Sequence, residues 1–190
     1  AGAEGAHRFV QRIWRLVSEA LPWISGPSAP LPADLSAAAT ALRKAAHKAL
    51  VAVEDDIEKL GFNRAVARIY ELANSLQKAL SDGGFASDVG LAAALREAVD
   101  ILVGLIAPMM PHLAEECWQT MGRDGLVAMR PWPVADRALT IDDTIVLPIQ
   151  INGRKRAELT IGREASEAEV RDATLALDAV VRALEAGRRA

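Results

Sequence analysis

Residues 101–122 read ILVGLIAPMMPHLAEECWQTMG, and this stretch decides the fold. In its first half, apolar residues would cover more of a helix than the single apolar stripe of a surface helix. This half therefore predicts a buried helix. Proline has no amide donor and disfavours helical geometry in the residue before it, so Pro108 should end that helix. Pro111 suits the first turn of a second helix, which carries Cys117 and Trp118. Two buried helices are therefore expected to meet at an elbow.

The composition favours a globular protein without a membrane segment. Of the 190 residues, 51% are apolar, which is enough for a substantial core. No segment approaches the roughly 20 apolar residues of a membrane span, and the N-terminal stretch does not resemble a secretory signal. The single cysteine, Cys117, excludes an internal disulfide framework. We therefore expect a cytoplasmic protein, with the monomer as the default state.

Upstream of the elbow, apolar residues recur at helical spacing in segments 4–21, 36–59, 63–80 and 91–105. Asp34 or Ser36 is expected to cap the second helix. Gly61 should end it in a left-handed conformation, Asn63 should cap the third helix, and Phe62 should pack back on its first turn. Between the first two helices, a loop that cannot be helical is predicted from its glycine and prolines: Pro22, Gly26, Pro27, Pro30 and Pro32.

The helices carry two rows of basic residues. These are Arg8, Arg12 and Arg15 on the first helix, and Arg64 and Arg68 on the third. Each row shares a helix face and could bind a phosphate strand, although the first row could equally be a solvated face and Arg68 could pair with Glu71. The net charge of −3 argues only weakly against nucleic acid, because phosphates respond to local charge.

The tail predicts a β-hairpin followed by helix. Asn152 and Gly153 separate two runs rich in β-branched residues, which is a strong signal for a tight hairpin turn. On the returning strand, Arg154 and Arg156 should project from one face and Lys155 from the other. These charges could contact RNA backbone or could only protect an edge strand from aggregation. After the hairpin, a capping box and then the row Val170, Ala173, Leu177, Val181 and Leu184 predict helix, with a break at Asp178.

The predicted fold class is mainly α, with an antiparallel helical bundle followed by a small α+β hairpin-helix domain. The bundle should cover residues 1–123 and the hairpin-helix domain residues 143–190. Between them, residues 124–142 form an irregular connector, and Trp132, which lies between two prolines, should clamp this connector onto the bundle.

No catalytic or metal site is predicted. His112 with Glu115 or Glu116 could form a catalytic pair, but the spacing is not that of a zinc protease. We favour a structural role in which the acids stabilise the start of their helix. The acidic cluster at residues 54–58 has no histidine or cysteine at ligand spacing, so it favours a charge-paired or solvated helix end.

The elbow resembles a known domain. Ala107, Pro108, Pro111, His112, Glu115, Glu116 and Trp118 form a pattern similar to the helical anticodon-binding domain of class I aminoacyl-tRNA synthetases for leucine, isoleucine, valine and methionine. FNRAVARI at 62–69 and GAHRFVQRIWRLV at 5–17 resemble two further blocks of that domain. LPIQINGRKR at 147–156 is similar to the C-terminal part of the bacterial leucyl-tRNA synthetase family.

The resemblance implies a tRNA-binding region. The parent enzyme would be an ATP-dependent leucine-tRNA ligase that uses Mg, whereas this piece lacks its catalytic signatures and editing domain and should be inactive and without cofactor. Its implied partners are a leucine tRNA and the upstream catalytic domains. The implied tRNA-binding residues are Arg8, Arg12, Arg15, Arg64, Arg68, Arg154, Lys155 and Arg156, recognising shape and phosphate rather than bases.

Two further expectations come from the resemblance. The hairpin domain would reach toward the long variable arm of the leucine tRNA. A final apolar strand that the family usually has past the point where this sequence ends, at Arg188-Arg189-Ala190, is missing, so the small domain should be one strand short. The alternatives are a helical protein-interaction module without RNA binding, or the equivalent domain of the isoleucyl or valyl enzyme.

Overall fold

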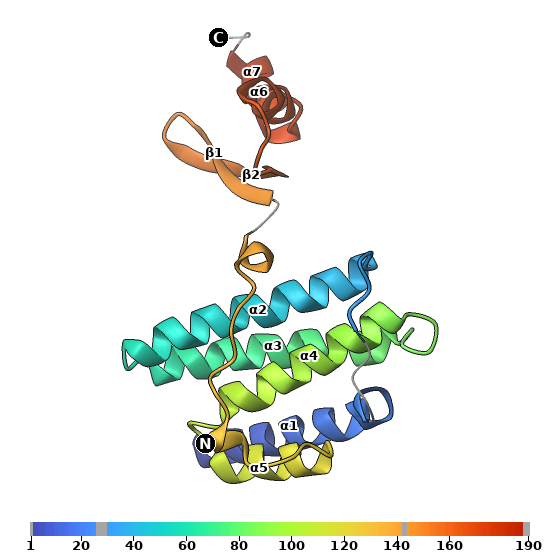
Figure 1. Cartoon of the computed structure of the whole chain (residues 1–190). Coiled ribbons are helices and arrows are strands. Elements are labelled where there is room, and N and C mark those ends of the chain that lie inside the picture. The colour runs from blue at the N-terminus through green and yellow to red at the C-terminus, as the bar shows by residue number, and fades with distance from the viewer. Residues whose placement is uncertain (1, 26–29, 142–143, 188–190) are drawn as a thin grey trace. The chain divides into compact units, whose positions relative to one another are not determined.

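The computed structural model describes residues 2–25, 30–141 and 144–187 and is mainly helical (Figure 1). It divides into two compact units, one up to Thr140 and one from Ile141 onward. The predicted boundary lies two residues further on, and residues 142 and 143 are outside the described part. The predicted fold class, a helical bundle followed by a small hairpin-helix domain, is confirmed. The first unit contains α1 (Gly2–Ile24), α2 (Ala37–Glu58), α3 (Phe62–Asp82), α4 (Val89–Ile106), α5 (Pro111–Thr120), η1 (Val127–Met129) and η2 (Arg137–Thr140).

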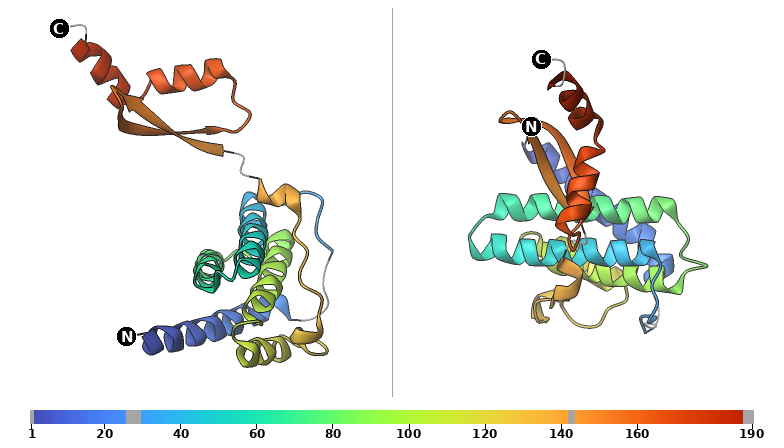
Figure 2. Two further views of the ribbon diagram at one scale, coloured as in Figure 1. Left: turned by 90° about the vertical axis from the view of Figure 1, so that its left-hand side faces the viewer. Right: turned by 90° about the horizontal axis from the view of Figure 1, so that it is seen from above.

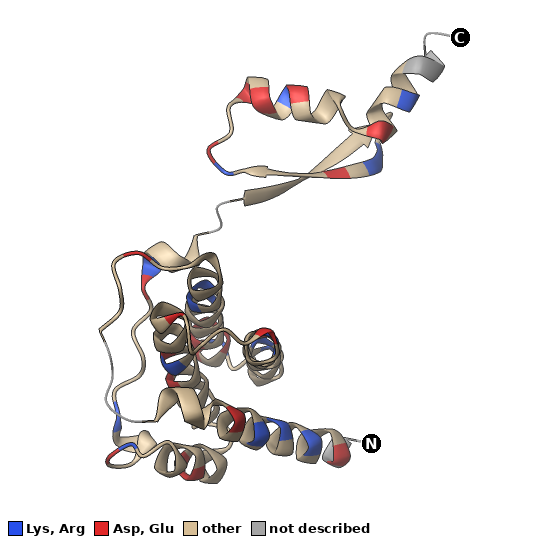
Figure 3. Cartoon of the chain, turned by 90° about the vertical axis from the view of Figure 1, so that its right-hand side faces the viewer, with Lys and Arg blue, Asp and Glu red and all other residues tan. Residues whose placement is uncertain are grey.

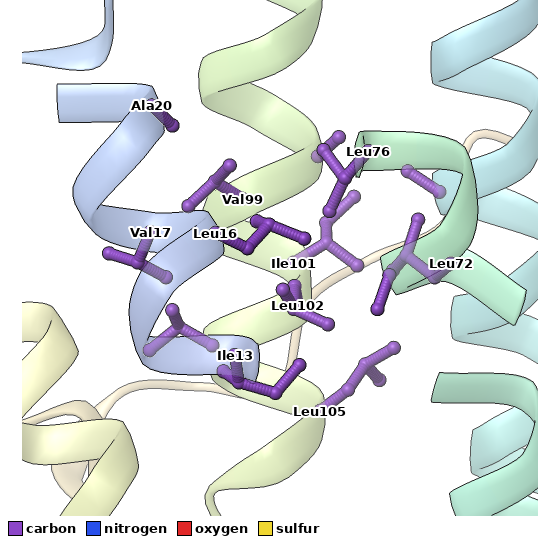
Figure 4. Packing of buried hydrophobic residues seen from close by; sticks show 14 of the residues in the cluster. Ile13, Leu16, Val17, Ala20, Leu72, Leu76, Val99, Ile101, Leu102 and Leu105 are labelled. Carbon is purple, nitrogen blue, oxygen red and sulfur yellow. The ribbon is translucent and has the colours of Figure 1, made fainter. Parts of the chain in front are cut away.

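The core of the bundle lies where α1, α3 and α4 meet. Helix α2 packs against α3 and α4, while α1 packs against α3, α4 and α5. Figure 4 shows Leu16 of α1, Leu72 and Leu76 of α3 and Leu102 of α4 pointing toward one another, and all four are buried. Burying each such side chain contributes roughly 1.5–3 kcal/mol. The predicted inner row of the fourth helix is buried throughout: Leu91, Leu95, Ala98, Leu102 and Leu105.

The elbow forms as predicted. Helix α4 ends at Ile106, whose carbonyl accepts hydrogen bonds from Met109 N at 3.0 Å and Met110 N at 2.8 Å. Pro111 occupies the first turn of α5. Cys117 on α5 is fully buried, and burial, helped by the charge of Glu116, raises its pKa to about 12. The elbow thus closes one end of the core.

The prediction for Pro22 is wrong, because this residue lies inside α1. A proline so near the end of a helix removes only one hydrogen bond, here to the carbonyl of Ser18. Continuing the helix buries Ile24 completely and brings the ring of Trp23 to 5.5 Å from that of Phe85. Tertiary packing therefore outweighs the proline. Gly26 and Pro27 of the predicted loop lie outside the described residues.

The corner between α2 and α3 differs from the prediction in which residue is left-handed. Leu60 has the positive φ of 56°, whereas Gly61 has a φ of −86°. Gly61 N donates to the carbonyl of Asp56 at 2.6 Å, and Leu60 N donates to that of Ile57 at 2.9 Å. A Cβ on Gly61 would lie 3.1 Å from the backbone carbonyl oxygen of Asp56, which is a tight contact, whereas its approach to the flexible side chain of Arg64 could be relieved by movement of that side chain. Glycine is therefore favoured here by close approach to backbone rather than by a left-handed turn.

The start of α3 also corrects two expectations. Gly61 occupies the N-cap position, so Asn63 lies within the helix and does not cap it. Phe62 is exposed and does not pack back on the first turn, and Leu60 is more exposed still, at 78%. The capping prediction for the second helix is confirmed, because the side chain of Ser36 accepts a hydrogen bond from Ala39 N.

The second unit is a hairpin with two short helices. Strand β1 (Thr144–Ile151) pairs antiparallel with β2 (Arg154–Gly162) through the predicted turn, in which Asn152 and Gly153 both have positive φ. Helix α6 (Glu167–Leu175) begins with the predicted capping box, and α7 (Asp178–Gly187) begins at the predicted break. On α7 the buried residue is Val180. Val181 and Leu184 of the predicted apolar row are exposed instead.

After α5 the connector returns along the bundle as an extended segment toward η2 (Figure 2). Trp132 packs against the core, which confirms its predicted role as a clamp. Gly104 of α4 makes this approach possible, because a Cβ there would lie 3.2 Å from Cγ of Pro133. None of the helices in the described ranges is both long and apolar enough to cross a membrane.

Candidate nucleic-acid interface

The arginine row on α1 is mostly free of acidic partners. Arg8 and Arg15 are exposed, and neither has a carboxylate partner among the described residues. Arg12 is half-buried, and its Nη2 donates to Oδ1 of Asn74 on α3 at 2.6 Å. Figure 3 shows basic residues recurring along α1. This row can therefore offer its charge to an external anion.

The two arginines of α3 are engaged by a buried acid. Asp56, on α2, is only 6% exposed. Its Oδ1 lies 2.7 Å from Nε of Arg64, and its Oδ2 lies 3.9 Å from Nε of Arg68. Arg68 also contacts Glu71 at 3.5 Å, so the predicted local pair is present. Both guanidinium groups remain partly accessible, but much of their charge is already compensated.

The same contacts explain the acidic cluster at the end of α2. Asp56 binds the arginines of α3, and Asp55 forms an ion pair with Lys59 at 2.7 Å. Within the described ranges, no group of three possible metal ligands is found. Asp55 and Asp56 of this cluster therefore serve ion pairing, while Glu58 is exposed.

On the hairpin, Arg154, Lys155 and Arg156 are all exposed. Lys155 pairs with Glu158, and this hydrogen bond lowers the pKa of Glu158. Arg154 and Arg156 have no acidic partner in the part of the chain that the structure describes. A bulge opposite Ile149 and Gln150 leaves Arg156 without a cross-strand partner. The bulge interrupts the predicted strict alternation of these side chains.

The structure does not join the two arginine groups of the bundle into one stripe. Arg12 contacts Asn74, on the side of α3 that faces α1. Arg68 lines a hollow with Lys48 and Ala52 of α2, on the other side of α3. The Arg64 and Arg68 pair therefore belongs to a different surface from the α1 row.

A polar cluster that the sequence did not reveal ties the connector to the bundle. His47 of α2 is only 4% exposed, its Nδ1 accepts from Asp136 N at 3.1 Å, and its Nε2 lies 3.0 Å from Oε1 of Glu97. Because Nδ1 accepts, Nε2 must carry the proton that is donated to Glu97. Arg43 Nε donates to Oε2 of Glu97 at 2.6 Å. We call these four residues the connector clasp.

The electrostatics of the connector clasp centre on Glu97. Burial alone would raise its pKa, but the hydrogen bonds from His47 and Arg43 lower it to about 2. The hydrogen bond that Arg43 donates to Glu97 correspondingly raises the pKa of Arg43. The spacing of Arg43 and His47, one helical turn apart on α2, was the only signal in the sequence. It gives no hint of the partner residues on α4 and the connector.

Glu115 at the elbow has a structural role, as favoured from the sequence, but at a different helix start from the one expected. His112 is exposed, and Glu115 instead accepts hydrogen bonds from Val127 N at 2.9 Å and Ala128 N at 3.0 Å. Glu115 thus stabilises the start of η1 and not of its own helix, so the expectation that it would stabilise α5 is wrong for this acid. No catalytic pair forms, because the carboxylate of Glu115 is occupied by these amides.

Comparison with known proteins places these features in a family. A family model described as the anticodon-binding domain of tRNA ligase matches residues 40–171. The leucine–tRNA ligase of Mesorhizobium japonicum is 58% identical over 185 residues, covering 97% of this chain and 21% of that protein. The leucine–tRNA ligase of Sinorhizobium fredii is 54% identical over the same shares. This chain therefore spans about a fifth of the length of these relatives.

A solved structure agrees with the sequence relatives. The crystal structure of the ternary LeuRS–tRNA–LeuAMS complex of Agrobacterium radiobacter matches with a TM-score of 0.79 and 29% identity. The match covers 96% of this chain and 23% of that one. Fold, elbow pattern and sequence similarity lead to the same assignment: the chain belongs to the family of anticodon-binding domains of tRNA ligases.

Proposed function

We propose that this chain is the tRNA-binding region of a leucine-tRNA ligase and that it holds a leucine tRNA for charging by other domains of the longer protein. The observation that carries the proposal is the α1 row, where Arg8 and Arg15 have no acidic partner in the described part of a chain of this family. The similarity to leucine–tRNA ligases supports the choice of leucine.

The proposed mechanism is positioning through phosphate contacts. Arg8 and Arg15 on the bundle and Arg154 and Arg156 on the hairpin would bind phosphate oxygens, because an arginine without an acid partner gives up no ion pair on binding. Arg12, Arg64, Arg68 and Lys155 also remain candidates. Each of these residues already has a partner, so a phosphate contact would add less binding free energy. Holding the tRNA body would fix where its acceptor end lies in a distant active site.

Chemistry would belong to the rest of the longer protein. Leucine, ATP and Mg would be bound by upstream domains, and this chain alone would be inactive and would need no cofactor. We expect it to act in the cytoplasm as a monomer. A charging assay with the isolated chain should show no leucylation, and adding the separately expressed upstream part should restore tRNA charging if the two associate.

The direct test is binding to a leucine tRNA at two salt concentrations. We expect affinity to fall steeply with salt, because each phosphate contact releases counterions. A tRNA with a short variable arm should bind more weakly if the hairpin contacts that arm. The double variant Arg154→Ala with Arg156→Ala should remove this preference. Lys78→Ala should serve as the control, because Lys78 is an exposed cation outside the proposed contacts and pairs with Asp82.

The proposal would be overturned if the chain bound neither tRNA in a salt-sensitive way while remaining folded, as judged from an intact melting transition. Such a result would favour a helical protein-interaction module over an RNA-binding region.

A further inference from the structure

A cavity of about 690 Å³ lies within the first unit, away from the α1 row. Its walls come from α4, α5, His47 on α2, the segment before α2 and the connector, and they include Arg96, Asp100, Trp118, Arg130 and Trp132. Small-molecule sites typically enclose about 300–1,000 Å³ and combine apolar walls with a few polar groups. The prolines and the two indole rings supply the apolar part of this wall.

One wall residue carries a donor without an acceptor. Nε1 of Trp132 is buried, and no hydrogen-bond partner for it exists among the described residues. The other wall indole is satisfied, because Trp118 Nε1 donates to the carbonyl of Asp124 at 3.2 Å. Buried indole N–H groups usually have a partner, so the cavity lacks an acceptor beside Trp132.

The charges of the wall favour an anion. Its two acids are already engaged: Asp100 accepts from Nη2 of Arg123 at 2.8 Å, and Glu97 belongs to the connector clasp. Burial, and next the neighbouring charge of Arg123, lower the pKa of Arg96, while the charge of Asp100 acts in the opposite direction. Arg96 and Arg130 are the arginines of this wall, and both of its carboxylates already accept hydrogen bonds. An anion placed near Arg96 would counter the repulsion from Arg123.

Arg130 adds a surface for a planar ring. Its guanidinium lies over the ring of Trp118, 4.6 Å from the centroid, while the residue itself is exposed. A guanidinium stacked on an indole is held in place and presents its outer face, on which aromatic rings and nucleobases commonly stack.

We propose that this cavity binds a planar organic anion of nucleotide size. The ring would lie against Arg130, the anionic group would lie near Arg96, and an acceptor on the ligand would satisfy Nε1 of Trp132. The chemistry is that of a nucleotide, which could be free or could be an unpaired residue of an RNA. The proposal does not rest on tRNA binding by the α1 row.

The test follows the four indole N–H signals in nitrogen–proton correlation spectra during titration with AMP, with adenosine and inorganic phosphate as comparison ligands. AMP should saturate with a dissociation constant below about 1 mM, and adenosine and phosphate should bind at least about tenfold more weakly. The signal of Trp132 should move downfield as it gains an acceptor. The signals of Trp14 and Trp23 on α1 should stay in place.

Variants of the cavity wall test whether the proposed contacts to AMP are responsible for its binding. Trp132→Phe and Arg96→Gln should each weaken AMP binding about tenfold. The matched controls Trp14→Phe and Arg171→Gln, the second of which changes an exposed arginine of α6, should leave it unchanged. Competition with a short single-stranded RNA then distinguishes the sources, because displacement of AMP indicates an RNA residue and its absence indicates a free nucleotide.

The proposal is overturned if AMP moves neither the Trp132 nor the Trp118 signal, or if AMP, adenosine and phosphate act alike. Equal affinity of AMP for the chain and for both Trp132→Phe and Arg96→Gln would overturn it as well. Tight tRNA binding with no AMP response would leave the proposed function standing and remove only this site.

Discussion

The outer face of α1 and the corner between α2 and α3 both carry a row of arginines in which neighbours are three or four residues apart. On α1, Arg8 and Arg15 have no acidic partner among the described residues. At the corner, Asp56 reaches across from α2 to Arg64 and Arg68. Equal spacing thus produces one surface open to an anion and one ion-pair cluster. Whether a basic row can bind RNA depends on what the neighbouring helix presents to it.

Ion pairs between an arginine and an acid of different segments, like those at the corner, recur elsewhere in the bundle. Arg43 is held by Glu97, and Arg123 is held by Asp100, in both cases across two different elements. The charged groups that join elements should therefore affect stability, and the arginines without acid partners should affect RNA affinity. This division can be tested by substitutions on both sides.

The largest effect is expected from Glu97→Ala. The variant leaves Arg43 and His47 without their acceptor inside the bundle, so the free energy of unfolding should fall by about 2–3 kcal/mol. Urea unfolding followed by circular dichroism measures it. Glu58→Ala, which removes an exposed acid from the same bundle, should change stability little. Equal stability of the two variants would contradict a stabilising role for the connector clasp.

The same residue gives a pH dependence. The pKa of Glu97 is about 2 in the folded chain against an ordinary 4.5, so its contribution is complete above pH 4.5 and is lost as the pH falls toward 2. Because the group is only half-buried, we expect a loss of about 2 kcal/mol over this range. The stability difference between the wild type and Glu97→Ala should shrink accordingly. A difference that stays constant down to pH 2 would contradict the assignment.

The next largest loss of stability is expected from the double variant Arg64→Ala with Arg68→Ala. It leaves the buried carboxylate of Asp56 without its two cations, which should cost about 1–2 kcal/mol of stability. Leucine-tRNA affinity should change less than threefold, because these arginines already have a partner. Chemical unfolding and filter binding measure the two quantities on the same preparation. A large loss of affinity with unchanged stability would reverse the comparison.

The double variant Arg8→Ala with Arg15→Ala should show the opposite behaviour. We expect leucine-tRNA affinity to fall about tenfold, and the slope of log affinity against log salt to decrease by about 2 if both residues contact phosphates. The melting temperature should stay unchanged. Lys78→Ala is the control, because Lys78 is exposed but pairs with Asp82.

The smallest change in tRNA affinity is expected from Asp56→Asn, which tests the comparison between the α1 row and the corner. Asp56→Asn keeps the size of the side chain but removes the charge that holds Arg64 and Arg68. Leucine-tRNA affinity should rise about two- to threefold if the corner lies within reach of the tRNA, with a stability loss near 1 kcal/mol. Unchanged affinity would mean that the tRNA does not reach the corner.

Much of the fold follows from local sequence. The elbow at Pro108 and Pro111 and the turn at Asn152 and Gly153 are set by residues next to one another, so their chemistry could be predicted directly. Pro22 was mispredicted because the burial of Ile24, which outweighs the proline, depends on distant helices.

The candidate interface was predictable only in part. The helix or strand that carries each of the eight basic residues could be predicted, and so could the local pair of Arg68 with Glu71. The partners of Arg12 and Arg64 could not, because Asn74 and Asp56 come from other helices. Asp136 bonds to His47 across 89 residues of sequence, and nothing local to either residue indicates the contact. Periodicity indicates which helix face a charge occupies. It does not indicate which side chain lies opposite.

Because Cys117 is buried, the only thiol of the chain can serve as a probe of how often the core opens. A thiol whose pKa is raised to about 12 carries almost no thiolate at neutral pH, and its full burial excludes reagents. A thiol reagent should therefore modify the chain only in molecules whose elbow has opened. The labelling rate then reports how often the junction of α4 and α5 opens, without any added probe.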